Sequence, residues 1–209
     1  MIRSYNEVAG RRLDRIAALS DGVFAVAMTL IVLEIRPPET GPIHSESDLW
    51  TALLTLGPRL VTYLMSFLTL GIFWNGQQTQ LNYFTTADRN LTWIHLLFLA
   101  TIALMPFSTS LLAEFITYRL ALVMYWANIF LTGAILYAAW IYASRAKLLS
   151  TDAGPTVSAA VTRRIVGAQA LYAFGALLSV ASTYWSIAFI VLVQLNFVIA
   201  PRIPLLSRL

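Results

Sequence analysis

The chain has 209 residues, of which 58% are hydrophobic and only 11% are charged, and its mean hydropathy is +0.71. A soluble domain carries about a quarter charged residues, so this composition excludes an ordinary soluble domain and indicates an integral membrane protein. The absence of cysteine excludes disulfides and thiolate metal sites, and in a membrane protein the net charge of +4 concerns topology rather than nucleic-acid binding.

Six segments approach the length of about twenty apolar residues that a membrane-spanning helix needs. They are 16–35, 49–74 with a bend near Pro58, 91–113, 120–143, 165–182 and the shorter 185–200. The first segment has the length of a span and no small-residue cleavage site, so we expect it to stay in place as a helix. The sequence predicts an all-α integral membrane protein with one six-helix transmembrane domain over residues 1–209.

The basic residues predict that both termini are cytoplasmic, because short cytoplasmic loops are rich in Lys and Arg. With that orientation, eleven of the fourteen basic residues lie inside: Arg3, Arg11, Arg12, Arg15, Arg89, Arg145, Lys147, Arg163, Arg164, Arg202 and Arg208. Only Arg36, Arg59 and Arg119 lie outside. Adding or removing one span would distribute the basic residues over both sides of the membrane. The observed distribution therefore favours six spans.

The first span has two unlike faces when each residue is turned by about 100° around the helix axis. Val26, Leu30 and Leu33 fall on one stripe with Thr29 beside them, so this face is aliphatic with one hydroxyl. Asp21 falls on the opposite face, near the cytoplasmic end, where we expect it to be buried. Val, Leu and Thr at helical spacing are most often packing or lipid contacts, and spacing alone favours that reading over a pore lining.

An ionisable side chain within a span needs partners, so Asp21 is expected to contact other helices. The candidate partners near the cytoplasmic ends are Trp74, Asn75, Gln77, Asn90 and His95, with Ser20 in the same network. Two interpretations stay open. Asp21 is a structural anchor that orients the first helix, which we favour, or it is a carboxylate that binds a proton or a cation. Glu34, next to Leu33, is either an attractor of cations at the outer mouth or a solvated surface charge.

No enzyme signature is present. The chain lacks the H-E-x-x-H, G-x-S-x-G and glycine-rich phosphate-loop patterns. Two histidines without cysteines or clustered carboxylates do not make a metal site by spacing. The sequence therefore predicts that the protein is not an enzyme.

Residues 15–25, R-I-A-A-L-S-D-G-V-F-A, resemble the R-x-x-x-F-S-D-G-V-F-A signature of the transmembrane protein 175 family, potassium channels of lysosomes and bacteria. Phe73-Trp74-Asn75 is similar to the family's tryptophan near the inner end of the second helix. Asn90 and the stretch M-P-F-S-T at 105–109 resemble its N…L-P-F-S-T pattern. The resemblance covers the first three helices well and the last three only in general character.

Two positions depart from the family pattern. Leu19 stands where the family has phenylalanine, and Gln77 stands where a histidine usually follows the tryptophan. We expect both in the hydrogen-bond network of the motif, with Gln77 donating to Asp21. A glutamine does not titrate near neutral pH, so a pH response that depends on that histidine is in doubt here.

The resemblance implies a homotetramer in a bacterial inner (plasma) membrane, with the first helices of four subunits around a central pore. It implies Val26, Leu30 and Leu33 as the pore face, Thr29 as a polar ring, and a hydrophobic constriction in place of a carbonyl filter. Arg15, Leu19, Ser20, Asp21, Trp74, Gln77 and Asn90 are its structural network. The expected function is a potassium-permeable channel with no cofactor beyond the permeating K⁺ and no nucleic-acid partner. The alternatives are a proton-coupled secondary transporter that uses Asp21 and a non-conducting scaffold.

Overall fold

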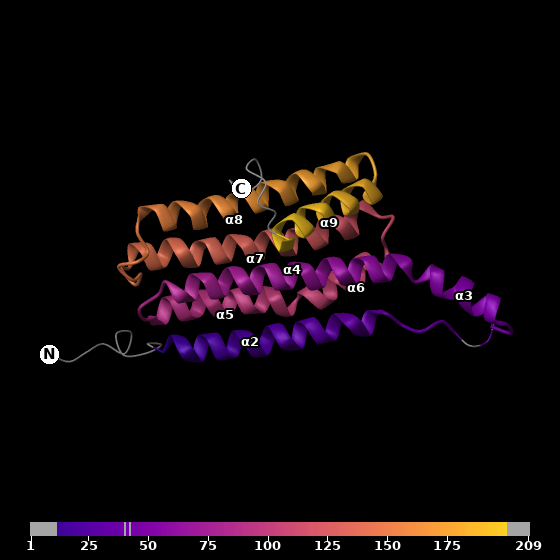
Figure 1. Ribbon diagram of the computed structural model, residues 1–209, viewed down its shortest axis with the longest axis horizontal. Coiled ribbons are helices and arrows are strands. Elements are labelled where there is room, and N and C mark those ends of the chain that lie inside the picture. The colour runs from indigo at the N-terminus through magenta and orange to yellow at the C-terminus, as the bar shows by residue number, and fades with distance from the viewer. Residues whose placement is uncertain (1–11, 40, 42, 200–209) are drawn as a thin grey trace.

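The computed structural model describes residues 12–39, 41 and 43–199 (Figure 1). The described helices are α2 (Leu13–Leu30), α3 (Glu46–Thr55), α4 (Gly57–Asn82), α5 (Arg89–Ala103), α6 (Met105–Glu114), α7 (Arg119–Arg145), α8 (Pro155–Leu177) and α9 (Thr183–Ile199). The 3₁₀ turns η1 (Ile31–Glu34) and η2 (Leu178–Val180) extend α2 and α8. In the described part of the chain the only strand-like pairing is one bridge between Phe84 and Leu149.

Local sequence explains where these helices begin. Ser45 caps α3, because its hydroxyl accepts a hydrogen bond from the backbone N–H of Asp48 at 3.1 Å. Asp88 caps α5 in the same way through Leu91, at 2.8 Å. Proline stands in the first turn of α4, α6 and α8, where its missing N–H costs nothing.

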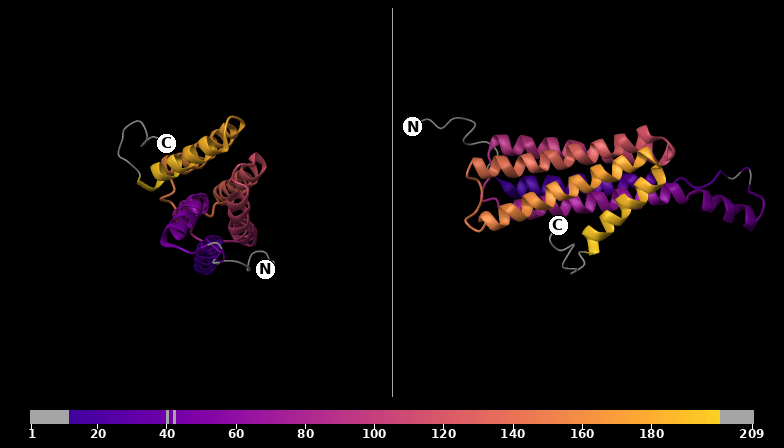
Figure 2. Two further views of the ribbon diagram at one scale, coloured as in Figure 1. Left: turned by 90° about the vertical axis from the view of Figure 1, so that its right-hand side faces the viewer. Right: turned by 90° about the horizontal axis from the view of Figure 1, so that it is seen from above.

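The helices form an antiparallel bundle in which α2 lies at one side and the α8/α9 pair at the other (Figures 1 and 2). Helix α7 packs against α5, α6 and α8, and α2 packs against α4 and α5. One buried cluster fills the middle of the bundle around Phe24, Phe98 and Tyr125, and a smaller one around Trp140 lies near the end where α2 begins.

The predicted second and third spans each consist of two helices. The second breaks at Leu56 between α3 and α4, which are bent by 44°, in line with the predicted bend near Pro58. The third breaks at Leu104 ahead of Pro106. There, Ser108 and Thr109 hydroxyls bond the carbonyl oxygen of Met105 at 3.0 and 2.8 Å, which secures the turn around the proline.

Among the described residues, Leu13–Glu34, Arg89–Glu114 and Arg119–Arg145 are long and apolar enough to cross a membrane. The bent pair of α3 and α4 adds a fourth if it counts as one span, and α9 is shorter. Helix α8 begins at Pro155, ten residues before the predicted fifth span. Six spans therefore stay a prediction. Of the basic residues used for orientation, Arg3, Arg11, Arg202 and Arg208 lie outside the described residues, as does the end of the sixth span.

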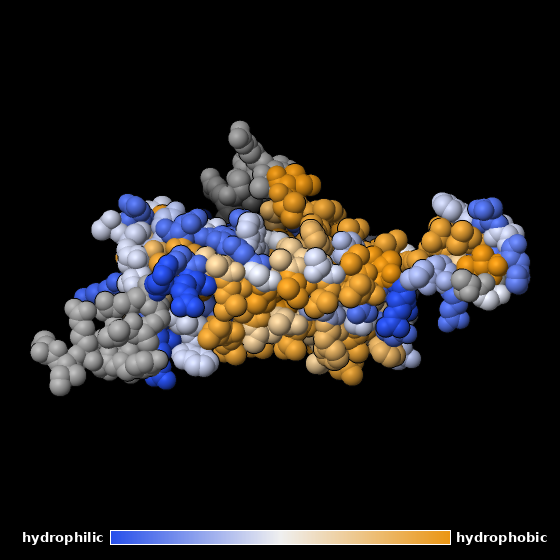
Figure 3. All heavy atoms as spheres, turned by 90° about the horizontal axis from the view of Figure 1, so that it is seen from below, coloured by the Kyte–Doolittle hydropathy of each residue, from blue (hydrophilic) through white to orange (hydrophobic). Residues whose placement is uncertain are grey.

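A space-filling view from the α2 side shows a broad apolar band across the bundle with hydrophilic residues at both ends (Figure 3). Helix α3 projects beyond one end of this band (Figure 1). Together with the apolar helices, this surface is that of a membrane protein.

Candidate functional site

Helix α2 is covered by the bundle on only one side. Phe24, Ala27 and Ile31 point into the core and are 2%, 2% and 0% exposed. Val26 and Leu33, by contrast, are 57% and 66% exposed. A helix whose uncovered side is this apolar needs lipid or another subunit against it.

The uncovered side of α2 borders a shallow groove next to the α5/α6 junction. Its volume is about 440 Å³, and Leu19, Gly22, Val26 and Leu30 line it with Pro106. Leu33 belongs to η1 rather than to α2. A 3₁₀ helix turns by about 120° per residue, and this keeps Leu33 close to the stripe that Val26 and Leu30 form.

Thr29 lies at the centre of the exposed arc of α2, between its aliphatic and its acidic edges. Its hydroxyl donates to the carbonyl oxygens of Ala25 and Val26 at 3.0 and 2.9 Å. Because the hydroxyl proton is used within the helix, the lone pairs of the oxygen face outward. The hydroxyl oxygen of Thr29 is therefore exposed and has a free acceptor position.

Asp21 lies at the edge of the exposed arc that faces α4. Its Oδ1 accepts hydrogen bonds from Trp74 Nε1 at 2.8 Å and from Gln78 Nε2 at 3.0 Å. Trp74 is one of the candidate partners that the sequence indicates for Asp21. The expectation that Asp21 is buried is wrong for the single subunit, because α4 covers only one of its flanks and the side chain is exposed.

A second polar contact joins α2 to α4 on the buried side. Gln77 Nε2 donates to Ser20 Oγ at 2.9 Å and lies 3.2 Å from Nδ1 of His95. Ser20 in turn donates to the carbonyl oxygen of Ile16 at 2.8 Å. The expected bond from Gln77 to Asp21 is therefore incorrect: the buried Gln77 donates to Ser20, while Trp74, which is 42% exposed, donates to Asp21.

Three other residues of the predicted network lie elsewhere. Leu19 is exposed on the aliphatic edge of α2, away from the hydrogen bonds. Asn90 donates instead to the hydroxyl of Tyr142 at 3.1 Å, and that hydroxyl bonds Asp88, the cap of α5. Arg15 is exposed and takes part in none of the hydrogen bonds that Asp21 and Ser20 form in the described structure.

The outer end of α2 holds its own carboxylate. Glu34 accepts a hydrogen bond from Ser110 of α6 at 2.8 Å. Arg36 and Arg59 line the same small cavity, and Arg59 forms an ion pair with Glu114 at 2.9 Å. Glu34 is half-buried, so it is more than a freely solvated charge.

Sequence reasoning missed Gln78 and Ser110. Gln78 follows Trp74 by four residues, which places both on one face of a helix, and this spacing could have identified it. Ser110 had no comparable signal, because its contact spans 76 positions of the chain. No group of three or more His, Cys, Asp or Glu residues that could hold a metal ion occurs within the described ranges.

Residues 15–106 match the family model described as endosomal/lysosomal potassium channel TMEM175. The chain is 33% identical over 178 residues to a potassium channel of Chamaesiphon minutus, an alignment that covers 83% of this chain and 87% of that protein. It is 40% identical over 103 residues to a potassium channel of Streptomyces collinus, covering 49% of this chain and only 48% of that relative.

The fold has a solved counterpart. The crystal structure of a lysosomal potassium-selective channel TMEM175 homolog from Chamaesiphon minutus superimposes with a TM-score of 0.79 and 26% identity. The match covers 91% of this chain and 98% of the other. Both the sequence of the first helices and the arrangement of the whole bundle are thus similar to those of one family.

Proposed function

The chain belongs to the TMEM175 family of ion channels and is a membrane cation channel rather than an enzyme, and we propose that four copies of it form a potassium-permeable pore lined by α2. In this proposal Val26, Leu30 and Leu33 face the shared axis. Thr29 supplies a ring of hydroxyl oxygens, and the polar contacts of Asp21 and Ser20 hold the helix in that orientation.

One observation carries the proposal. The core packs against a single arc of α2, and the residues left uncovered include the aliphatic stripe and Thr29 as well as Asp21. Four such helices around an axis would cover these side chains with one another and complete the packing that one subunit lacks. Gly22, next to Val26 in the groove, has open space where a side chain would stand, so α2 helices have room to approach closely there.

The chemistry of this lining favours K⁺ modestly. Four leucine side chains at one level narrow a pore and can expel water from it. A dehydrated passage costs K⁺ less than Na⁺, because K⁺ holds its water less tightly. Thr29 oxygens replace part of the lost shell, without the many oxygens of a carbonyl filter. No resident cofactor is needed for this mechanism.

The proposal extends to the setting of the channel. The basic residues at the ends of α2, α5 and α7 lie at the end of the bundle where α8 begins (Figure 1). Arg36, Arg59 and Arg119 lie at the opposite end. This segregation supports six spans with both termini cytoplasmic, and the bacterial relatives support the inner membrane as the location.

A proton-coupled transporter that uses Asp21 is the rival. In the described structure Asp21 is held by two neutral donors from one helix, Trp74 and Gln78, an arrangement that suits a fixed anchor better than a carrier. A non-conducting scaffold is the third possibility. It predicts that changes in the stripe of α2 leave ion flux unaffected.

The deciding experiment is electrical. Purified protein in a planar bilayer with opposed K⁺ and Na⁺ gradients should give a passive current whose reversal potential shifts toward that of K⁺. Leu30→Ala widens the constriction and should raise the conductance or reduce the K⁺/Na⁺ selectivity. Leu192→Ala is the control, because Leu192 is an exposed leucine of α9, on the far side of the bundle. Slow, saturating, proton-coupled flux would favour the transporter. If Leu30→Ala changed neither the conductance nor the selectivity, α2 would not line the pore.

A further inference from the structure

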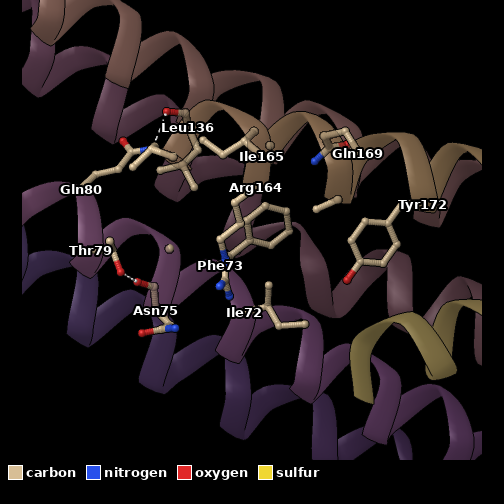
Figure 4. A pocket seen from close by; sticks show the side chains of 14 residues that line it. Ile72, Phe73, Asn75, Thr79, Gln80, Leu136, Arg164, Ile165, Gln169 and Tyr172 are labelled. Atoms are coloured by element: carbon tan, nitrogen blue, oxygen red, sulfur yellow. Dashed lines mark hydrogen bonds between the residues drawn. The ribbon is translucent and has the colours of Figure 1, made fainter. Parts of the chain in front are cut away.

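A cavity of about 130 Å³ lies between α4 and α8 with α7 as its floor, on the opposite side of α4 from Asp21 (Figure 4). We call it the α4/α8 slot. Its walls are mainly apolar and include Phe73, Gly76, Leu136, Ile165 and Ala168. An apolar cavity of about 150 Å³ admits benzene. The slot is therefore of a size to take a part of a hydrocarbon chain and is too small for a helix of another protein.

The slot also contains polar atoms that have no partner in the described structure. The amide oxygen of Gln80 is buried and accepts no hydrogen bond, although the amide nitrogen donates to the carbonyl oxygen of Leu136 at 3.2 Å. Gln80 is 1% exposed as a whole. A buried acceptor of this kind is costly to leave unsatisfied. It favours an occupant that brings a hydroxyl or water to this end of the slot.

Arg164 supplies a positive charge between the two ends of the slot, near Phe73 and Ile72 (Figure 4). Its side chain extends from α8 across the opening toward α4 (Figure 4). The guanidinium lies over the ring of Phe197, 5.6 Å from its centroid. No carboxylate of the described residues forms an ion pair with it; the two pairs there are Arg12–Asp14 and Arg59–Glu114. A cation in a membrane helix that lacks an acidic partner attracts an anion.

The wall of α8 that lines the slot is mainly apolar, but it also carries two buried polar atoms without a partner in the described structure, the amide oxygen of Gln169 and the hydroxyl of Tyr172. From Arg164, the wall of α8 continues through Ile165 and Ala168 to Tyr172, eight residues further on. At 1.5 Å per residue this is a run of about 12 Å toward the middle of the bundle. Gly133 in the floor lets the side chain of Gln169 lie against α7, because a Cβ there would stand 1.7 Å from Gln169 Nε2. The missing side chain at Gly133 thus leaves room for the side chain of Gln169 beside α7.

We propose that the α4/α8 slot binds an anionic glycerophospholipid of the cytoplasmic leaflet. Its phosphate pairs with Arg164, a headgroup hydroxyl or a water that enters with it donates to Gln80, and one acyl chain runs along Ile165 and Ala168. A basic pocket between membrane helices on the cytoplasmic side has the chemistry that recognises such headgroups. The assignment of the leaflet rests on the proposed topology, whereas the site itself is independent of ion conduction.

Native mass spectrometry of the delipidated full-length protein, incubated with phosphatidylglycerol or with phosphatidylcholine, tests this. We expect the wild type to retain phosphatidylglycerol in preference to phosphatidylcholine. Arg164→Gln should lower the retained phosphatidylglycerol about fivefold, as expected for loss of one basic contact. Arg163→Gln is the matched control, because Arg163 is the neighbouring exposed arginine and does not line the slot. Equal losses in both variants would mean diffuse attraction to the surface and would overturn the proposal.

A second pair of variants tests the acyl-chain position. Ala168→Leu fills the slot and should lower lipid retention, while Ala170→Leu, on the exposed side of α8, should leave it unchanged. Size-exclusion chromatography confirms that each variant is assembled. Unchanged retention in Ala168→Leu, or equal retention of the two lipids, would contradict the assigned site. Because the readout is mass rather than current, a failure here is distinguishable from a failure of the proposed channel function.

Discussion

The two ends of α2 hold their carboxylates differently. At the inner end, Asp21 receives two hydrogen bonds, both from neutral donors of α4. At the outer end, Glu34 receives one from Ser110 of α6 and shares its cavity with Arg36 and Arg59. The inner end is thus fixed by hydrogen bonds alone, while the outer end sits in a cluster of charges. We infer that the inner end sets the rotation of the helix and that the outer end affects mainly the local ion concentration.

The largest effect is expected from Asp21→Ala. The change leaves the indole N–H of Trp74 and the amide of Gln78 without their acceptor and removes two hydrogen bonds to a charged group. Such bonds contribute about 1.5–3 kcal/mol each. We therefore expect the assembled particle to be lost or to melt at a clearly lower temperature, measured by size-exclusion chromatography and a thermal unfolding assay.

Glu34→Ala is the comparison variant for this experiment, and it should lower stability less because only one bond is lost. The opposite result for Asp21→Ala would be an intact assembly without ion flux. In that case Asp21 would belong to the ion path rather than to the anchor of α2.

A smaller effect is expected from Trp74→Phe. Phenylalanine keeps an aromatic ring at this position and removes only the N–H that bonds Asp21, while Gln78 still donates. Loss of one of the two bonds should cost about half as much stability as Asp21→Ala, on the order of 1.5 kcal/mol. The measurement is again thermal unfolding of the assembled protein.

Trp93→Phe is the matched control, because Trp93 is a 61% exposed tryptophan of α5 with no hydrogen bond in the described structure. If both tryptophan variants unfold at the same temperature, the indole bond to Asp21 makes no contribution to the orientation of α2.

The difference between the two ends also explains what the sequence could predict. The Asp21–Trp74 contact was predictable, because an acidic residue within an apolar run demands a donor and few donors lie at the same depth. Gln77 was assigned to the wrong partner, because Ser20 and Asp21 are adjacent on α2 and spacing along α4 does not show which of the two Gln77 reaches. Asn90 was misplaced because the start of α5 is set by the Asp88 cap and its bond to Tyr142, a contact 54 positions apart.

The helix boundaries show the same division between local and distant causes. The bend near Pro58 agrees with the sequence prediction, and the turn at Pro106 likewise follows from proline chemistry. The start of α8 at Pro155 was missed, because Arg163 and Arg164 made its first ten residues look like a loop. In the structure this polar part packs along α7, where the Trp140 indole donates to Ser158 at 3.3 Å. Such packing has no signature in a single sequence.

The smallest effect is expected from Glu34→Gln, which keeps an acceptor for Ser110 and removes only the charge. A negative charge near a pore mouth raises the local concentration of cations, and salt screens it over about 10 Å at 0.1 M. The K⁺ current should therefore fall at low ionic strength and match the wild type at about 1 M salt, where the screening length is near 3 Å. Glu46→Gln, on the exposed start of α3, is the control. A current that falls equally at all salt concentrations would instead place Glu34 within the conduction path, because a direct contact with the ion is not screened.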